Sequence, residues 1–323
     1  MIRLYKIQEA QLKEIDVESF KDHLDEATWI DLYQPTEHEE RLIENLLNIN
    51  IPTRDEMHEI ELSSRLYKRN NTVFTTFVMT TNVNTSTPES HAVTFVLHHK
   101  HLITIRYVDV APFNACPTKL KSQKEDYRQG SSIFAWMLEE ITDQLADILE
   151  NIAHAIEKTS LEIFNSQNGV TVSQVNFKKI LSAIGTYQNL LSKSQESLFG
   201  LTRVVSFIAG TSYFEGAYEH KSIQLTKQDL PPLIEHATFL SNKINFLLDA
   251  TLGMINIEQN AIIKIFSVAA VVFLPPTLIA SAYGMNFTAM PELHWSFGYP
   301  MALILMVLSA FLPYKFFKHK GWL

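Results

Sequence analysis

The chain has 323 residues, a formal net charge of −8 and 46% hydrophobic residues. This acidic balance, without a basic stripe, gives no electrostatic reason to expect a nucleic-acid partner. The single cysteine, Cys116, excludes an intrachain disulfide framework and a cysteine-based metal cluster within one chain, as suits a reducing cytoplasm. Apolar residues are concentrated beyond residue 261 and most charges precede it, which predicts a soluble part followed by a membrane part.

Residues 1–125 alternate short strand-like and helical patterns and predict a cytoplasmic α+β domain. The chain opens with charged residues and no long apolar run, so we expect no secretory signal peptide. Two hairpins are predicted, Ser64–Lys68 with Val73–Met79 around Arg69-Asn70-Asn71, and Val93–Leu97 with Leu102–Tyr107. Helical patterns cover Glu37–Leu47 and Arg54–Leu62.

No catalytic motif stands out in this part. His98-His99-Lys100-His101 lies at the second hairpin turn, where consecutive side chains point in different directions and lack ligand spacing, so we interpret them as turn residues. No nucleophile elbow, zincin motif or Gly-rich phosphate loop is present. We therefore expect a protein that is not an enzyme and needs no organic cofactor.

Residues 126–260 are predicted to form a cytoplasmic bundle of long helices and a stalk. Amphipathic patterns cover about 132–165 and 174–208, with Asn168-Gly169 between them. The last helix is predicted to begin near Pro231-Pro232 and to run without a break as far as Pro275. Its length of about 75 Å far exceeds one bilayer, so most of it is expected to lie in the cytoplasm.

Two further segments have the length and composition of membrane spans, for which roughly 20 apolar residues suffice. We predict a first transmembrane helix at 261–283, an outer, periplasmic loop at 284–296, a second helix at 297–317 and a basic cytoplasmic tail at 318–323. Aromatic residues mark the ends of the second span, and lysines lie only on the side away from the loop. The positive-inside rule therefore places both termini in the cytoplasm. The alternative is a buried helical hairpin of a soluble protein.

A polar stripe runs along the last helix in an a/d pattern. Its members are Asp249, Gly253, Asn256, Asn260, Ile263, Ser267, Ala270, Leu274, Thr277, Ser281 and Gly284. A coiled-coil seam would carry Leu, Ile or Val at such positions, whereas most of these residues are small or polar. Polar groups are costly inside a bilayer unless they face a partner or water, so the polar stripe predicts the lining of a pore.

One copy of a two-helix membrane segment cannot enclose a pore, so this interpretation requires a homo-oligomer with the first span inside and the second facing lipid. The alternative is that small residues only permit tight helix packing. Pro275-Pro276 removes two backbone donors, and we expect a bend there.

The polar stripe offers amide, hydroxyl and carbonyl oxygens, and no Cys, His or carboxylate within the membrane. Zn²⁺ is usually held by Cys, His or carboxylates, whereas Mg²⁺ prefers oxygen and keeps several of its waters. The chemistry therefore favours hydrated Mg²⁺. Glu292 in the loop could attract cations to the outer mouth; alternatively, it is a solvated loop acid.

Several motifs cluster in the last third of the chain: Asn256-Ile257-Glu258-Gln259-Asn260, the region of Pro275-Pro276-Thr277, Tyr283-Gly284-Met285-Asn286, Met290-Pro291-Glu292-Leu293, and the C-terminal run from Lys318 to Leu323. Together they resemble the motifs of the CorA family of magnesium and cobalt transporters, of the enterobacterial type. The resemblance extends over the order of domains and is strongest from Asn256 to Leu323.

The resemblance implies a funnel-shaped homopentameric channel in the bacterial inner membrane. It implies a selectivity filter of Gly284, Met285 and Asn286, with Asn286 contacting hydrated Mg²⁺, and a constriction at Ile263 and Phe266. The expected pore-lining residues are Asp249, Asn256, Asn260, Ile263, Phe266, Ser267, Ala270, Leu274, Thr277 and Ser281. The resemblance also implies influx of Mg²⁺, and of Co²⁺ and Ni²⁺, driven by the membrane potential. Cytoplasmic Mg²⁺ is expected to close the channel. A zinc-selective relative and a non-conducting membrane-tethered sensor are the alternatives.

Overall fold

A computed structural model describes residues 1–8, 11–15, 23–59, 61–85, 87–119, 129–164, 176–214, 216–285, 290–291 and 295–322. The chain divides into two units. The first comprises Met1–Glu162 and Lys178–Leu247, and the second comprises Ile163–Phe177 and Leu248–Leu323. The first unit contains a β-sheet and long helices, and the second contains the two apolar helical segments.

The sheet has seven strands in the order β2-β1-β3-β7-β6-β5-β4. They are β1 (Ile2–Gln8), β2 (Gln11–Ile15), β3 (Trp29–Tyr33), β4 (Leu66–Arg69), β5 (Thr72–Thr81), β6 (Glu89–His98) and β7 (His101–Arg106). Only the β3–β7 pair is parallel among the strand pairs of the described residues. Both predicted hairpins are present. Asn70 and Asn71 have φ angles of 47° and 60°, as a two-residue type I′ turn between β4 and β5 requires.

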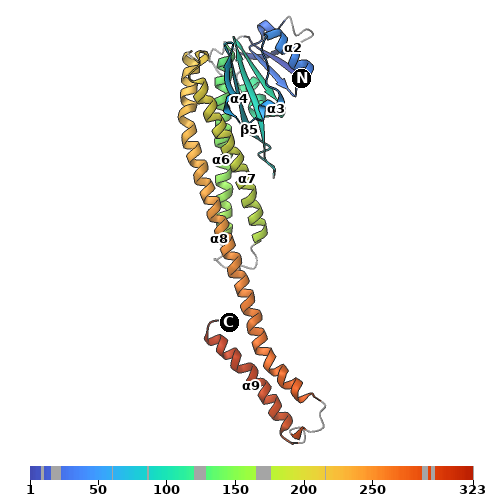
Figure 1. Ribbon diagram of the computed structural model, residues 1–323. Coiled ribbons are helices and arrows are strands. Elements are labelled where there is room, and N and C mark those ends of the chain that lie inside the picture. Colours follow the sequence, from blue (N-terminus) through green and yellow to red (C-terminus); the bar gives the residue numbers. More distant parts are fainter. Residues whose placement is uncertain are drawn as a thin grey trace. The chain divides into compact units, whose positions relative to one another are not determined.

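An apolar cluster lies on each face of the sheet, and different helices cover the two faces (Figure 1). Ile30, Val96 and Ile103 belong to a core that also contains Ile43 of α2 (Glu37–Leu47) and Met57 of α3 (Arg54–Met57). A second cluster joins Phe77 and Phe95 of the sheet to Phe113 of α5 (Ala111–Lys119) and Phe134 of α6 (Gly130–Phe164), with the Phe95 and Phe134 ring centroids 4.8 Å apart. The sheet is therefore covered on both faces.

The predicted helix over Arg54–Leu62 is wrong, and so is the predicted start of the following strand. The structure has the short helices α3 and α4 (Leu62–Arg65) instead, and β4 begins at Leu66 rather than Ser64. Thr53 and Glu56 form a capping box that starts α3. The amide of His58 then donates to the carbonyl of Asp55 over 3.0 Å, and the Arg65 side chain bonds to the carbonyl of Glu59. These contacts end α3 after one turn, because they occupy the carbonyls of Asp55 and Glu59 that would accept from later amides in a longer helix.

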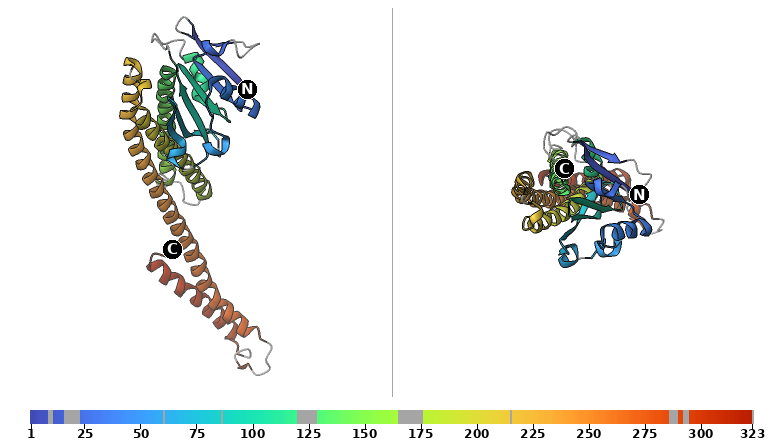
Figure 2. Two further views of the ribbon diagram at one scale, coloured as in Figure 1. Left: turned by 45° about the horizontal axis from the view of Figure 1, so that its top comes forward. Right: turned by 90° about the horizontal axis from the view of Figure 1, so that it is seen from above.

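Three long helices complete the first unit, where α6, α7 (Phe177–Ile208) and the first part of α8 (Ala217–Tyr283) run side by side (Figures 1 and 2). Both predicted helical patterns are present as α6 and α7, and the predicted break at Asn168-Gly169 lies outside the described residues. Two short 3₁₀ helices span Leu24–Glu26 and Ser212–Phe214. Gly130 lies where α6 approaches β7, and a Cβ there would overlap the backbone of Leu102.

The predicted start of the last helix near Pro231 is also wrong, since α8 begins at Ala217 and contains both prolines. A proline inside a helix costs about 3 kcal/mol relative to alanine. Ile223, Leu230 and Ala237 are all buried, at intervals of seven residues on either side of the proline pair. The same face of α8 is thus buried before and after the prolines, and this burial offsets their cost.

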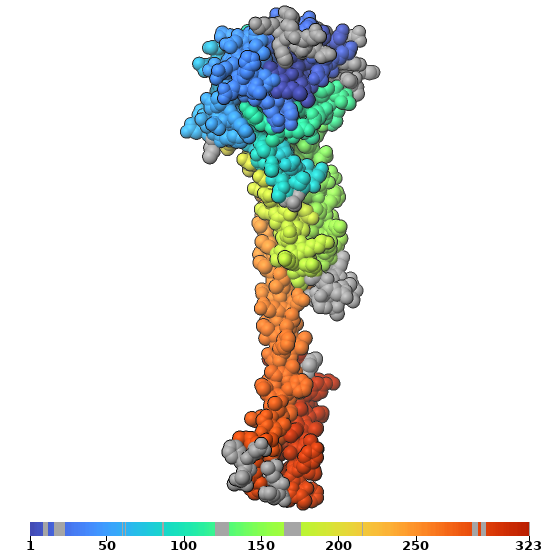
Figure 3. All heavy atoms as spheres, turned by 90° about the vertical axis from the view of Figure 1, so that its right-hand side faces the viewer, coloured from blue at the N-terminus to red at the C-terminus, as the bar shows by residue number. Residues whose placement is uncertain are grey.

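In the second unit, the end of α8 and α9 (Gly298–His319) lie side by side as an antiparallel pair (Figures 1 and 2). Both helices contain a stretch that is long and apolar enough to cross a membrane. Figure 3 shows one face of this pair, with the side chains of both helices at the surface. The helix α8 continues through Pro275-Pro276, where the bend stays a prediction.

Candidate functional site

Every residue of the polar stripe is exposed in the single chain. The exposed set runs from Asp249 to Gly284 and includes Phe266, which is 72% exposed beside the polar stripe. An α-helix turns about 100° per residue, so positions at a/d spacing stay on one side over several turns. The structure therefore places the predicted pore-lining residues along one uncovered face of α8.

The covered face of α8 is the opposite one. Val268 of α8 is 4% exposed and Ala302 of α9 is 6% exposed, and these two helices lie side by side (Figure 1). Val272 and Ile279 are also partly covered. At about 100° per residue, these three α8 positions lie roughly half a turn around the helix from Ile263. The helix α9 is thus packed against the side of α8 that faces away from the polar stripe.

Two members of the polar stripe show how its polar and small residues are arranged. The hydroxyl of Thr277 donates to the carbonyl of Phe273 over 2.7 Å, so its proton is used within the helix and its remaining lone pairs can accept. Gly253 has no atom within 4 Å of where a Cβ would stand. The fold of one chain gives no steric reason for glycine there, although glycine costs a helix about 1 kcal/mol relative to alanine.

The first two residues of the predicted filter lie where α8 ends. The amide of Gly284 donates to the carbonyl of Ala280 over 2.9 Å, and the amide of Met285 donates to Ala282 over 3.4 Å. A Cβ on Gly284 would stand 3.0 Å from the oxygen of Ala280, which is a tight contact. Asn286 and Glu292, for which we predicted the first ion contact and the outer negative charge, lie outside the described residues.

An apolar extension of the polar stripe was missed in the sequence. Leu225, Phe239 and Phe246 are exposed on α8, and their positions continue the heptad series of Gly253 and Asn260 towards the N-terminus. We call these three residues the apolar seam. Counting heptads upstream of Asp249 would have revealed it. Large apolar side chains at such spacing are typical of a surface that packs against another helix.

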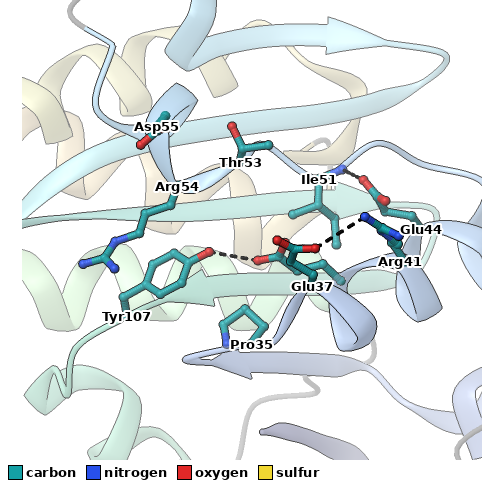
Figure 4. Close-up of a pocket in the computed structure, with 10 residues that line it drawn as sticks. Pro35, Glu37, Arg41, Glu44, Ile51, Thr53, Arg54, Asp55 and Tyr107 are labelled. Atoms are coloured by element: carbon teal, nitrogen blue, oxygen red, sulfur yellow. Dashed lines mark hydrogen bonds and ion pairs between the residues drawn. The ribbon is translucent and has the colours of Figure 1, made fainter.

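The first unit, which we call the soluble unit, has a hollow next to α2, and several of the polar groups that line it bind one another (Figure 4). The Tyr107 hydroxyl donates to Glu40 over 2.8 Å, and the Arg54 guanidinium lies 5.0 Å from the Tyr107 ring centroid. Burial and this bond to Glu40 raise the pKa of Tyr107. Glu44 accepts from the amide of Ile51 over 2.9 Å. These contacts join α2 to the segment that follows it and to Tyr107, which follows β7.

The histidines of the β6–β7 turn are also held by structural contacts. His98 Nδ1 lies 2.8 Å from the Thr72 hydroxyl, and buried His101 donates from Nδ1 to the carbonyl of Ala27 over 2.6 Å. The backbone amide of His99 donates to the Tyr213 hydroxyl over 3.1 Å. Within the described residues, no group of three or more His, Cys, Asp or Glu side chains is placed to hold a metal ion.

Comparison with known proteins gives one consistent family. Residues 25–319 match the family described as "CorA-like Mg2+ transporter protein". The "Magnesium transport protein CorA" of Salmonella typhimurium is 34% identical over 328 residues and covers 100% of both chains. The protein of the same name from Wolinella succinogenes is 36% identical over 299 residues, with 91% of each chain covered.

The fold has a solved counterpart in the CorA magnesium transporter from Methanocaldococcus jannaschii, with a TM-score of 0.76 at 18% identity. That match covers 100% of this chain and 99% of the archaeal one. The shared fold extends over the α/β unit, the long helices and the apolar helix pair. The full-length relatives and the family match together show that this chain belongs to the CorA-like Mg²⁺ transporter family, whose members are ion transporters rather than enzymes.

Proposed function

We propose that this protein transports Mg²⁺ across a membrane through a pathway that several copies line with their polar stripes. The observation that carries the proposal is the position of the polar stripe, exposed along α8 on the side away from α9. A polar face inside a bilayer needs water or a partner, and α9 covers only the opposite side. The relatives named as magnesium transport proteins support Mg²⁺ as the ion.

The proposed assembly is a homopentamer with α8 inside and α9 facing lipid. The apolar seam supports association of copies through α8, because its large side chains are exposed in one chain. The same heptad series then changes from apolar side chains to glycine and asparagine. This change supports close packing of the cytoplasmic helices followed by a wetter pathway towards the membrane.

The proposed filter is formed by Gly284, Met285 and Asn286 from each copy, with Glu292 raising the local cation concentration at the outer mouth. Hydrated Mg²⁺ presents water protons, so its surroundings must accept hydrogen bonds. The amide oxygen of Asn286 can accept, and so can the Thr277 hydroxyl, whose proton is engaged by Phe273. Ile263 and Phe266 would form the narrow apolar section, where dewetting opposes conduction.

The proposed direction is inward, into a cytoplasm that contains both termini and the soluble unit of an inner-membrane protein. The membrane potential favours entry by roughly 2.3 kcal/mol per charge per 100 mV, and twice that for a divalent ion. Co²⁺ and Ni²⁺ are proposed as further transported ions. Binding of cytoplasmic Mg²⁺ to the soluble parts is proposed to close the pathway.

The test is ion flux into liposomes that contain the purified full-length protein and an internal Mg²⁺ indicator. Wild-type protein should admit Mg²⁺ under an inside-negative potential, and Asn286→Ala should abolish this flux. Ser281→Ala, in the polar stripe, should lower it, whereas Ser309→Ala on α9 is the matched control. Unchanged flux in Asn286→Ala would refute the filter assignment, and no flux of any divalent ion would favour a sensor.

Three further measurements on the same preparation address the finer parts of the proposal. Native mass spectrometry should give a mass of five chains. Repeating the flux with Co²⁺, Ni²⁺ and Zn²⁺ ranks the ions, and preference for Zn²⁺ would overturn the proposed substrate. Raising the internal Mg²⁺ concentration should slow entry, and a rate independent of internal Mg²⁺ would contradict the feedback.

A further inference from the structure

The C-terminal end of α9 is closed by a Schellman-type cap. Gly321 has a φ of 69°, which favours glycine, and its amide donates to the carbonyl of Lys318 over 3.2 Å. The amide of Trp322 donates to the carbonyl of Phe317 over 3.0 Å. The Trp322 ring stacks on Phe317 with the centroids 5.3 Å apart. The cap thus holds the indole against the last turn of α9.

Three lysines lie close to this indole in the sequence. Lys315, Lys318 and Lys320 are exposed within one and a half turns of the helix, and the sequence contains no Asp or Glu after Glu292. We call these three lysines together with Trp322 the basic cap. The segment after Glu292 therefore offers no acidic side chain that could neutralise the basic cap.

A fourth lysine of the same unit lies at a similar height. Lys264 of α8 precedes Tyr283 by 19 residues, and Lys318 of α9 follows Gly298 by 20 residues. Because the two helices are antiparallel neighbours, both lysines lie about 30 Å from the loop that joins them. This distance is close to the thickness of a bilayer hydrocarbon core. The lysines therefore mark one membrane boundary.

The neighbouring apolar residues indicate that this boundary meets lipid. Phe316 is 58% exposed between Lys315 and Phe317, and Phe311 and Leu312 are exposed one turn earlier. Tryptophan favours the headgroup level, where its ring meets apolar chains and its N–H remains hydrated. Such a surface matches an anionic lipid. Its apolar side chains can contact the acyl chains, and its ammonium groups can contact the phosphate of the headgroup.

We propose that the basic cap binds the phosphate headgroups of anionic phospholipids at the membrane surface, with Lys264 of the neighbouring helix contributing charge. Basic residues at a membrane surface each favour anionic lipid by about fivefold. The lysine ammonium groups supply donors to the phosphate oxygens, and the stacked Trp322 anchors the cap at headgroup depth. The cap would thereby hold the end of α9 in place and select lipids of one charge.

The test places full-length protein in nanodiscs of equimolar phosphatidylcholine and phosphatidylglycerol and counts the retained lipids by native mass spectrometry. Wild-type protein should retain phosphatidylglycerol preferentially. The variant Lys315→Gln/Lys318→Gln/Lys320→Gln should lose this preference by at least about tenfold. The control, Lys178→Gln/Lys221→Gln/Lys227→Gln, removes the same charge from exposed positions of the soluble unit and should keep it.

Two results from the variants would overturn the proposal: an unchanged preference in the first triple variant, or an equal loss in the control. The first would show that the lysines contact something else, such as acidic side chains of another copy. Wild-type protein gives a second measurement that does not depend on folding of a variant. Its preference should weaken as salt rises from about 0.1 M to about 1 M, where the Debye length falls from about 10 Å to about 3 Å. A preference independent of salt contradicts a charge-based site.

Discussion

The carboxylate of Asp31 and the guanidinium of Arg106 form a buried ion pair across the parallel strands β3 and β7. Nη2 of Arg106 donates to Oδ2 of Asp31 over 2.8 Å, and both side chains are almost completely buried. The Thr104 hydroxyl donates to the same carboxylate, and the Trp29 indole donates to Thr104. Arg106 also lies 4.5 Å from the Tyr33 ring centroid. This network joins the sheet at its single described parallel pairing.

Breaking this ion pair should destabilise the soluble unit strongly. In Asp31→Asn the charge of Arg106 stays buried without its counter-charge, and such changes typically cost about 3–5 kcal/mol. Asp109→Asn is the matched control, because Asp109 contacts the same arginine but is 64% exposed, and exposed pairs contribute about 1 kcal/mol or less. Urea unfolding of the detergent-solubilised protein, followed by near-UV circular dichroism, measures both. If both variants lose the same free energy of unfolding, burial of Asp31 does not make its ion pair more important than that of exposed Asp109.

Much of this architecture could be predicted because it depends on short-range patterns. The hairpin turn at Asn70-Asn71 and the polar stripe follow from local backbone preference and helical periodicity. The helix start at Ala217 could not be predicted, because burial of Leu230 and its neighbours decides it over the signal of Pro231. The Asp31–Arg106 pair joins residues 75 positions apart, and no local pattern brings them together. Asn286 was predicted from a motif resemblance alone, and its role stays a prediction.

Acidification should destabilise the soluble unit through His101. Burial lowers the pKa of His101, so the folded protein keeps the ring neutral while the unfolded chain takes up a proton below about pH 6.5. The unfolded state then binds more protons, and stability falls as the pH drops from about 6.5 towards the lowered folded-state pKa. The melting temperature should therefore fall between about pH 7.5 and about pH 5.5.

Two variants separate the contribution of His101 to the pH dependence of the melting temperature from that of other titrating groups. His101→Gln keeps a donor for the carbonyl of Ala27 and removes the titration, so its melting temperature should depend less on pH in this range. His154→Gln is the control, because His154 is exposed on α6. The interpretation fails if the wild-type protein and His101→Gln show the same pH dependence.

Substitution of Gly253 by alanine should reveal whether another copy approaches α8. In one chain a Cβ at Gly253 or at Gly185 of α7 meets open space. Alanine in place of either glycine should then stabilise its helix by about 1 kcal/mol. If copies associate along the polar stripe, Gly253→Ala should instead weaken the oligomer, while Gly185→Ala should not. Native mass spectrometry over a detergent series measures the oligomer, and equal behaviour of both variants would argue against close approach at Gly253.

Two neighbouring isoleucines on α8 provide a matched test of the proposed narrow section. Ile263 belongs to the polar stripe and is 53% exposed, whereas Ile265 is 64% exposed and lies well around the helix from Ile263. If Ile263 lines an apolar constriction, Ile263→Ala should widen and wet it, and the dewetting barrier should fall. We expect several-fold faster Mg²⁺ entry at high internal Mg²⁺, where the wild-type pathway is proposed to be closed.

Ile265→Ala removes the same atoms from a position with similar exposure, so it should leave the entry rate close to that of the wild type. Both variants should keep similar melting temperatures, since neither side chain is buried within one chain. Liposome flux under a fixed potential gives both rates. If Ile265→Ala accelerates entry and Ile263→Ala does not, the pathway must lie on another side of α8, because the two positions face different surroundings and differ in little else.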